Sequence, residues 1–175
     1  MDAKTISKLV RKVPDYPQPG VVFRDITPLL ADADAFADVV EAMSTRIEAH
    51  HARALVALEA RGFLFGAAIA SRLQMPLHLA RKPGKLPCET VRRSYALEYG
   101  EDGLELHADA FAGDTRCAIV DDVLATGGTA AAAAELISAL GAKPVCCVVL
   151  LELESLGGRK RLGEVPVESL LIDEP

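Results

Sequence analysis

The sequence predicts an α/β protein with a doubly wound, mostly parallel sheet, a small hairpin lid and an N-terminal arm. Three observations lead to this fold class. Short apolar runs typical of buried strands alternate along the chain with helical patterns, which favours a series of parallel βαβ units. Residues 93–108 break that alternation with the pattern of a hairpin. The opening of the chain, about residues 1–30, is interrupted by prolines and predicts an irregular arm.

Length and composition limit the class of protein. The chain has 175 residues, half of them apolar, and this is the size of one globular domain, so we expect a single domain over residues 1–175. The formal net charge of −6 argues against nucleic acid or an anionic membrane surface as a partner. No apolar run reaches membrane-spanning length and the opening residues form no signal-peptide core, so we expect a cytoplasmic protein.

The four cysteines suggest neither a metal site nor a disulfide framework. Cys146 and Cys147 are adjacent inside an apolar run and are expected to be buried. Cys88 and Cys117 lack the spacing of a second metal ligand.

The first fifty residues predict one long helix after the arm. Residues 5–12 carry a weak helical pattern, and residues 13–20 contain too many prolines for regular structure. Residues 33–50 predict an amphipathic helix, because apolar side chains recur there at helical spacing. These side chains are Phe36, Val39, Val40, Met43 and Ile47.

The rest of the chain predicts strands and helices in alternation. Residues 54–58 are wholly apolar and are expected to form a buried strand, while residues 62–73 predict a helix that ends before Pro76. The alanines at residues 130–134 belong to a second helix, which Gly141 ends. Further strands are expected at residues 77–80, 117–123, 145–151 and 169–172.

A lid is expected at about residues 82–108. Residues 81–92 predict an irregular stretch, and loops of that length inside a compact domain are commonly functional. The hairpin pattern follows: Tyr95, Leu97 and Tyr99 alternate with small or polar residues, and residues 101–103 are expected to form the turn.

Two adjacent carboxylates mark the end of the apolar run that starts at Cys117. Asp121 and Asp122 can accept hydrogen bonds from vicinal sugar hydroxyls. A turn of small residues then opens a helix, and its N–H groups suit a phosphate. The two halves together predict a site for ribose 5-phosphate, although the residues alone leave an ordinary acidic strand-to-helix turn as the alternative. The turn consists of Ala125, Thr126, Gly127, Gly128 and Thr129.

Residues 120–129 resemble the phosphoribosyl pyrophosphate motif of the type I phosphoribosyltransferases. Other segments resemble the adenine-using members of that family, in register over nearly the whole chain. They are residues 19–26, 59–66, 81–87 and 95–100. The resemblance implies the fold of that family and an enzyme of purine salvage, which transfers ribose 5-phosphate from phosphoribosyl pyrophosphate to adenine and yields AMP and pyrophosphate.

Residues 59–62 follow a predicted strand and open a helix, so their N–H groups and the Arg61 guanidinium suit a second anion. A surface arginine in a capping contact is the alternative. The resemblance implies a non-proline cis peptide between Glu59 and Ala60. Ala60 stands where many relatives have serine, which removes one hydroxyl but no backbone group. The pyrophosphate contacts that the resemblance implies are Glu59, Ala60, Arg61, Arg81, Lys82, Lys85 and Tyr99.

Arg61, Lys85 and Glu98 are the catalytic residues that the resemblance implies. Arg81, Lys82 and Lys85 form a basic strip that can neutralise a leaving pyrophosphate, with a solvated basic loop as the alternative. Glu98 lies on the predicted hairpin, where a shielded carboxyl group can exchange a proton with the base. An exposed strand glutamate is the alternative reading of Glu98.

By the same resemblance, Val22 and Arg24 read the purine edge through their backbones, Phe23 stacks on the ring and Leu153 closes the other face. Taken by itself, the segment also fits a core phenylalanine beside a surface arginine. The resemblance further implies Mg²⁺ held mainly by the substrate phosphates, without a metal cage of protein ligands, and a homodimer in which Arg81 reaches the neighbouring site.

Two other functions fit parts of the pattern. One is a phosphoribosyltransferase for another purine. The other is a regulator that keeps the sugar-phosphate site without catalysis, but such a protein would be expected to lack the basic lid and Glu98.

Overall fold

A computed structural model describes residues 3–96 and 101–173. The chain divides into two compact units, Met1–Ala42 and Met43–Pro175. Among the described residues, no helix combines the length and the apolar character needed to cross a membrane. The single domain expected over residues 1–175 stays a prediction.

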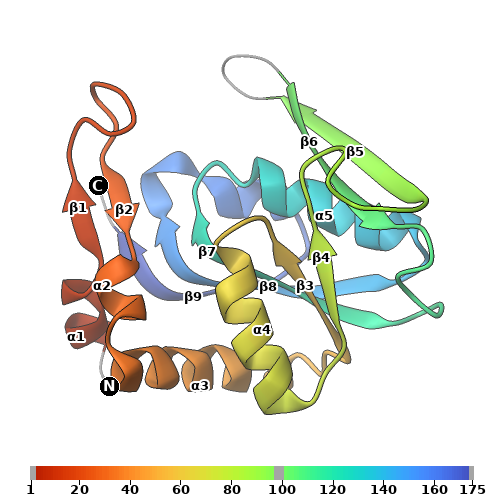
Figure 1. Ribbon diagram of the computed structural model, residues 1–175, viewed down its shortest axis with the longest axis horizontal. Coiled ribbons are helices and arrows are strands. Elements are labelled where there is room, and N and C mark those ends of the chain that lie inside the picture. The colour runs from red at the N-terminus through yellow and green to blue at the C-terminus, as the bar shows by residue number, and fades with distance from the viewer. Residues whose placement is uncertain (1–2, 97–100, 174–175) are drawn as a thin grey trace. The chain divides into compact units, whose positions relative to one another are not determined.

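The first unit contains a two-stranded antiparallel sheet and short helices (Figure 1). The prediction of a helix over residues 5–12 is wrong beyond Lys8, because Arg11 pairs with Asp25 of the neighbouring strand. The prediction that residues 13–20 form no regular structure is confirmed for residues 14–20 and wrong at Val13, which pairs with Phe23 of the neighbouring strand. The elements are α1 (Ala3–Lys8), β1 (Arg11–Val13), β2 (Phe23–Asp25), α2 (Thr27–Leu30) and the start of α3 (Ala33–Ala49), which confirms the predicted amphipathic helix.

The second unit is built on a five-stranded parallel sheet (Figure 1). Two of the strands have the predicted bounds, and the other three extend a residue or two further at each end. The arrangement confirms the doubly wound α/β class. In spatial order the strands are β4 (Leu77–Ala80), β3 (Ala54–Leu58), β7 (Arg116–Leu124), β8 (Lys143–Leu153) and β9 (Val167–Asp173).

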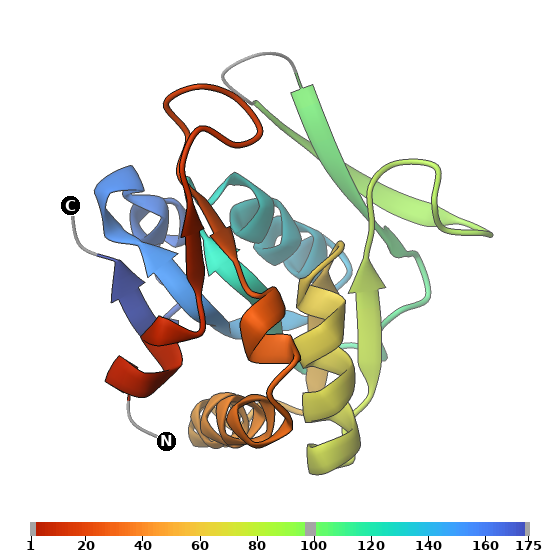
Figure 2. The same cartoon turned by 60° about the vertical axis from the view of Figure 1, so that its left-hand side comes forward.

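Helices α4 (Gly62–Leu73) and α5 (Gly128–Ala139) cover opposite faces of this sheet (Figures 1 and 2). Gly66 of α4 approaches Ala57 so closely that a Cβ on the glycine would lie 2.5 Å from the alanine Cβ. On the other face, Leu136 of α5 belongs to the same buried cluster as Val56. Val56 and Ala57 are adjacent in β3 and therefore point to opposite faces, which gives each helix an apolar surface to cover.

Gly141 ends α5, as predicted. Its φ of +78° is in the left-handed region that glycine adopts readily. The N–H of Gly141 donates to the carbonyl oxygen of Ser138 over 3.0 Å, and the N–H of Ala142 donates to that of Ile137 over 3.1 Å. These two bonds form a Schellman motif, which satisfies the last carbonyl groups of the helix.

A hairpin and two 3₁₀ helices fill the remaining connections of the second unit. Strands β5 (Thr90–Ala96) and β6 (Glu101–His107) pair antiparallel next to α5, which confirms the predicted hairpin. The turn predicted at residues 101–103 is wrong, because these residues pair with residues 94–96 of β5. The prediction of irregular chain over residues 81–92 is wrong from Thr90 onward, because residues 90–92 pair with β6. The 3₁₀ helices η1 (Glu154–Leu156) and η2 (Gly158–Leu162) connect β8 to β9, and no sequence pattern predicted them.

Candidate active site

Two strand ends meet where the order of the sheet reverses. β3 and β7 are neighbours, but the chain continues from β3 to β4 on one side and from β7 to β8 on the other. In sheets of this kind ligands bind at the carboxyl ends of such strands. Residues 59–61 follow β3, while Asp121 and Asp122 lie near the end of β7. The structure thus brings together two predicted groups that are far apart in the sequence.

The paired carboxylates of β7 are held close together and next to a guanidinium. Asp122 is 4% exposed, and its Oδ2 lies 2.8 Å from Nε of Arg61. The backbone N–H of Asp122 donates to Oδ1 of Asp121 over 2.9 Å. Burial raises the pKa of both carboxyl groups; the charge of Asp122 adds to the effect at Asp121, and Arg61 opposes it at Asp122. Hydrogen-bond donors such as sugar hydroxyls would relieve this unfavourable pairing.

A small cavity of about 80 Å³ lies between Asp121 and the start of α5. It is lined by Asp121, residues 123–130 and Val149. Helix α5 begins at Gly128, and its N-cap residue, Gly127, has no side chain that could cap the helix, so the partial positive charge of the first N–H groups suits an anion. One cavity therefore has a carboxylate on one side and a helix N-terminus on the other, as a sugar phosphate requires.

Glu59 organises the cations at the end of β3. Its Oε2 lies 3.2 Å from Nε of Arg81 and accepts the N–H of Lys82 over 2.8 Å, while Nζ of Lys85 donates to its Oε1 over 3.1 Å. The peptide between Glu59 and Ala60 is cis, which confirms that prediction. Burial by itself would raise the pKa of Glu59, but these hydrogen bonds outweigh it and lower the pKa. The side chains of Arg81 and Lys85 thus share one carboxylate, which Lys82 contacts through its backbone N–H.

Replacing Glu59 with glutamine is expected to lower the free energy of unfolding at pH 7 by about 1.5–3 kcal/mol, the range for a hydrogen bond to a charged group. Because the folded pKa lies below the ordinary value of 4.5, the carboxylate stabilises the fold above that pH. This stabilisation is lost as the pH falls through the folded pKa. In thermal unfolding, the difference in Tm between wild type and Glu59→Gln should therefore shrink as the pH falls below 4.5. Glu164→Gln, at an exposed position, is the control, and a gap that persists unchanged to pH 3 would contradict the assignment.

The basic strip has further partners on β6. Nζ of Lys82 forms an ion pair with Asp102, and the N–H of Gly84 donates to Oε2 of Glu105 over 3.0 Å. The backbones of Arg81 and Glu105 also exchange two hydrogen bonds, of 3.0 and 2.8 Å. Sequence reasoning missed Asp102 and Glu105, since they lie on the other strand of the hairpin and no spacing signals the pairing.

The residues expected to hold the base belong to different units. Val22 is exposed, and its carbonyl accepts a 2.6 Å hydrogen bond from Nη1 of Arg24. The Phe23 ring packs edge-on against Tyr16 with 5.3 Å between centroids. Leu153 is the last residue of β8 in the second unit. The assembly of these residues into one base pocket stays a prediction.

The remaining predictions concern two residues of the lid and the cysteines. Glu98 and Tyr99 lie outside the described residues, so their roles stay predictions. Cys146 and Cys147 are fully buried, as expected, and burial raises the pKa of the Cys146 thiol to about 12. Cys88 is exposed.

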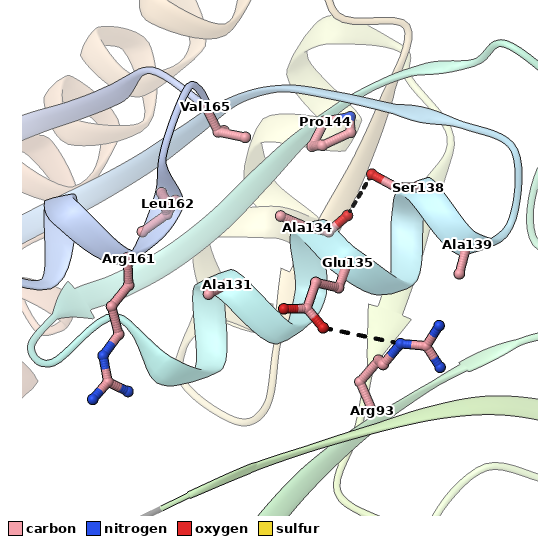
Figure 3. A pocket seen from close by; sticks show the side chains of 10 residues that line it. All are labelled: Arg93, Ala131, Ala134, Glu135, Ser138, Ala139, Pro144, Arg161, Leu162 and Val165. Atoms are coloured by element: carbon pink, nitrogen blue, oxygen red, sulfur yellow. Dashed lines mark hydrogen bonds and ion pairs between the residues drawn. The ribbon is translucent and has the colours of Figure 1, made fainter.

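A second, larger hollow of about 530 Å³ runs along α5 between β5 and η2 (Figure 3). Arg93 and Arg161 lie at its edges, and the carboxylate of Glu135 is 3.9 Å from Nε of Arg93. Alanines of α5 form much of its lining. Neither a pair of carboxylates nor the start of a helix lines this hollow, so it lacks the groups that hold a sugar phosphate.

Known proteins resemble this chain in both sequence and structure. The family model described as "Phosphoribosyl transferase domain" matches residues 29–171. The adenine phosphoribosyltransferase of Kineococcus radiotolerans is 54% identical over 168 residues, which cover 96% of this chain and 91% of that protein. The crystal structure of the enzyme of that name from Thermoanaerobacter pseudethanolicus has a TM-score of 0.95 and 45% identity, covering 98% of this chain and 99% of that one. The Saccharomyces cerevisiae enzyme, complexed with adenine and D-2,5-dideoxy-2,5-imino-altritol 1,6-bisphosphate, has a TM-score of 0.92 and 35% identity, covering 96% and 97%.

Proposed function

This chain belongs to the adenine phosphoribosyltransferases, within the family of the phosphoribosyl transferase domain, and from that membership we propose which residues carry its reaction. The enzyme transfers the ribose 5-phosphate group of phosphoribosyl pyrophosphate to adenine and yields AMP and pyrophosphate, a step of purine salvage. The observation that carries the assignment of residues is the meeting of Arg61, the Asp121 and Asp122 carboxylates and the uncapped start of α5 around two adjacent strand ends.

The ribose phosphate is assigned to the end of β7. The N–H groups of residues 125–129 bind the 5-phosphate at the start of α5. Asp121 and Asp122 accept hydrogen bonds from the ribose hydroxyls, which orients the ring. Breaking the anomeric C–O bond places positive charge on the sugar, and the two carboxylates lie where they stabilise it.

The pyrophosphate is assigned to the end of β3 and the basic strip. Negative charge builds on the leaving group as the anomeric bond breaks. Arg61, Lys82, Lys85 and the backbone of residues 59–62 are placed to neutralise that charge. Glu59 holds Lys85 through its carboxylate, and this fixes the ammonium group before the substrate arrives.

The base and the lid complete the proposal. The backbones of Val22 and Arg24 read the adenine edge, Phe23 and Leu153 cover its two faces, and Glu98 exchanges a proton with the imidazole ring of the purine. Closure of residues 82–100 excludes water that would otherwise hydrolyse the activated sugar.

Mg²⁺ is proposed to bind together with the pyrophosphate group. Within residues 3–96 and 101–173, no group of three or more His, Cys, Asp or Glu side chains is placed to hold a metal ion. Mg²⁺ commonly takes most of its ligands from phosphates and water, so the substrate phosphates would hold it without a cage of protein ligands. The ion would neutralise part of the charge that develops on the leaving group.

We also propose a cytoplasmic homodimer in which Arg81 reaches the site of its partner. Free thiols at all four cysteines suit a reducing compartment. Light scattering on the purified protein measures the dimer. Mixing Arg81→Ala with an Asp121→Asn variant tests the sharing, since mixed dimers should regain activity that neither variant has alone. A monomer, or no regain on mixing, would contradict this part of the proposal.

The base specificity is tested by one assay of pyrophosphate release with adenine, hypoxanthine, guanine and xanthine. Adenine is expected to be the preferred substrate by a wide margin. Negligible turnover of adenine with efficient turnover of a 6-oxopurine would reject the assignment. Specific binding of phosphoribosyl pyrophosphate without turnover of any base would instead favour a regulator.

Glu98→Gln is expected to lower kcat by about 10²-fold, the lower range for a general acid or base. Binding of phosphoribosyl pyrophosphate should change little, because Glu98 is assigned to the base and not to the phosphates. Steady-state kinetics and calorimetric titration separate the two effects. An equal loss of binding and turnover would point to a role in folding, and Glu89→Gln, at an exposed position, is the control.

A further inference from the structure

An ion pair between a buried carboxylate and an exposed guanidinium ties together β8, β9 and the helix η2. Glu152 in β8 is 4% exposed. Its two carboxylate oxygens accept hydrogen bonds of 3.0 and 2.5 Å from Nε and Nη2 of Arg159, a bidentate arrangement. Ser169 in β9 donates to the same carboxylate over 2.6 Å, and Nη1 of Arg159 donates to the carbonyl of Val167 over 2.7 Å. Arg159 thus has one fixed position relative to both strands.

The residue before Arg159 touches the phosphate loop, which we define as residues 125–129. A Cβ on Gly158 would overlap the carbonyl oxygen of Ala125, and a Cβ on Gly127 would overlap the carbonyl oxygen of Gly158. The two backbone segments therefore pack directly on each other with no side chain between them. Any shift of Gly158 is transmitted to the loop at the start of α5.

The same ion pair is adjacent to the residue assigned to the base. Leu153 follows Glu152 in β8 and is the last residue of that strand. Glu152 precedes Leu153 in β8, and its carboxylate binds Arg159, which follows Gly158 in η2. One pair of side chains therefore connects a wall of the base pocket to the phosphate loop.

We propose that Glu152 and Arg159 are positioning residues, which hold the phosphate loop and Leu153 at the separation that a bound nucleotide requires. This inference rests on the proposed function of the loop and of Leu153. A bidentate guanidinium pair suits the task because its planar geometry fixes both distance and direction, whereas an apolar contact fixes neither. A displacement of about 1 Å in such a site is enough to reduce the rate about 100-fold.

The test compares Arg159→Gln and Glu152→Gln with Arg161→Gln, a matched control. Arg161 lies on the same short helix, is exposed, and has no hydrogen bond or ion pair with the rest of the described chain. Arg159→Gln and Glu152→Gln are each expected to raise KM for both phosphoribosyl pyrophosphate and adenine at least tenfold. The double variant should be no worse than the more damaged single variant, because both remove the same interaction. Arg161→Gln should stay within twofold of wild type.

The split between KM and kcat distinguishes positioning from stability alone. A variant that merely populates less folded enzyme loses kcat in proportion and keeps both KM values, and that result for Arg159→Gln would overturn the proposal. If Arg159→Gln does not fold, Arg159→Lys carries the same test, since it keeps the charge opposite Glu152 but lacks the planar fork. It should raise both KM values at least threefold, and unchanged values would overturn the proposal.

Failure of the inference and failure of the proposed function give different results. If wild type does not use adenine, the proposed function is wrong, and the positioning role that rests on it is wrong as well. If wild type uses adenine but Arg159→Gln and Arg161→Gln behave alike, the function stands and the positioning role is wrong. Amide hydrogen exchange over the phosphate loop gives an independent measurement: exchange should speed up in Arg159→Gln and remain at the wild-type rate in Arg161→Gln.

Discussion

An enzyme with asparagine at both 121 and 122 is expected to lose about 10³-fold in kcat/KM for phosphoribosyl pyrophosphate. Each carboxylate accepts a hydrogen bond from a ribose hydroxyl, and a bond to a charged group contributes about 1.5–3 kcal/mol. Two such bonds sum to a factor of about 10² to 10⁴, at roughly 1.4 kcal/mol per factor of ten. Steady-state kinetics with saturating adenine measures the loss. Asp114→Asn is the control, because Asp114 is exposed and its carboxylate forms an ion pair with the exposed Lys143.

The same double variant is expected to be more stable than wild type in the absence of substrate, by on the order of 1 kcal/mol. Burial raises the folded pKa of both carboxyl groups above the ordinary value of 3.8, and the charge of Asp122 raises the pKa of Asp121 further. The ionised pair therefore destabilises the fold at neutral pH, and this effect disappears as the pH falls through the raised pKa toward 3.8. In thermal unfolding, the variant should have a higher Tm than wild type at pH 7 and the same Tm near pH 4. Unchanged kinetics in this variant would refute the ribose assignment. A variant less stable than wild type at pH 7 would refute the charge argument.

Replacing Gly127 with alanine is expected to reduce kcat/KM for phosphoribosyl pyrophosphate by about 10³-fold, comparable with losing two charge-assisted hydrogen bonds. Gly127 has a φ of +79°, and a Cβ there would overlap the carbonyl oxygen of Gly158. The phosphate loop must then move away from η2, and its N–H groups no longer converge on one anion. Titration with ribose 5-phosphate and steady-state kinetics both measure the effect.

Gly141→Ala is the matched control for this change. Gly141 lies at the other end of the same helix with a φ of +78°, but nothing lies within 4 Å of where its Cβ would be. It should lose about 1–2 kcal/mol of stability from the left-handed backbone alone and keep its kinetic constants. Equal kinetic losses in the two variants would show that backbone conformation, and not the contact with Gly158, explains the result at Gly127.

The elements that could be predicted are those whose pattern is local. The wholly apolar run at Ala54–Leu58 is a strand with the predicted bounds, because burial on both faces leaves no polar position. Helix α3 follows from its apolar spacing, and the end of α5 from Gly141. Two predictions failed because a strand elsewhere in the chain supplied backbone hydrogen bonds. Arg11 was expected in a helix but pairs with β2, and the irregular stretch expected to reach residue 92 ends before Thr90, which pairs with β6.

The candidate site divides in the same way. Asp121, Asp122 and the phosphate loop are contiguous, so their residue types alone indicated a sugar phosphate. The partners of the basic strip were not predictable, because Asp102 and Glu105 become neighbours of Lys82 and Gly84 only when the hairpin forms. Gly158 gave no local signal either, since its importance comes from the backbone that it touches.

The sequence by itself determined the class of fold and the order of its strands and helices along the chain, and it predicted a site for a ribose phosphate. Each of these depends on the spacing of residue types within a few turns of helix or one strand, and spacing is visible in the chain. Only the tertiary structure decided that Glu59 gathers the cations, that Arg61 lies against Asp122, and that Glu152 and Arg159 join the phosphate loop to β8. Such contacts form between residues that the order of strands in the sheet brings together, and that order is set by the burial of the whole core.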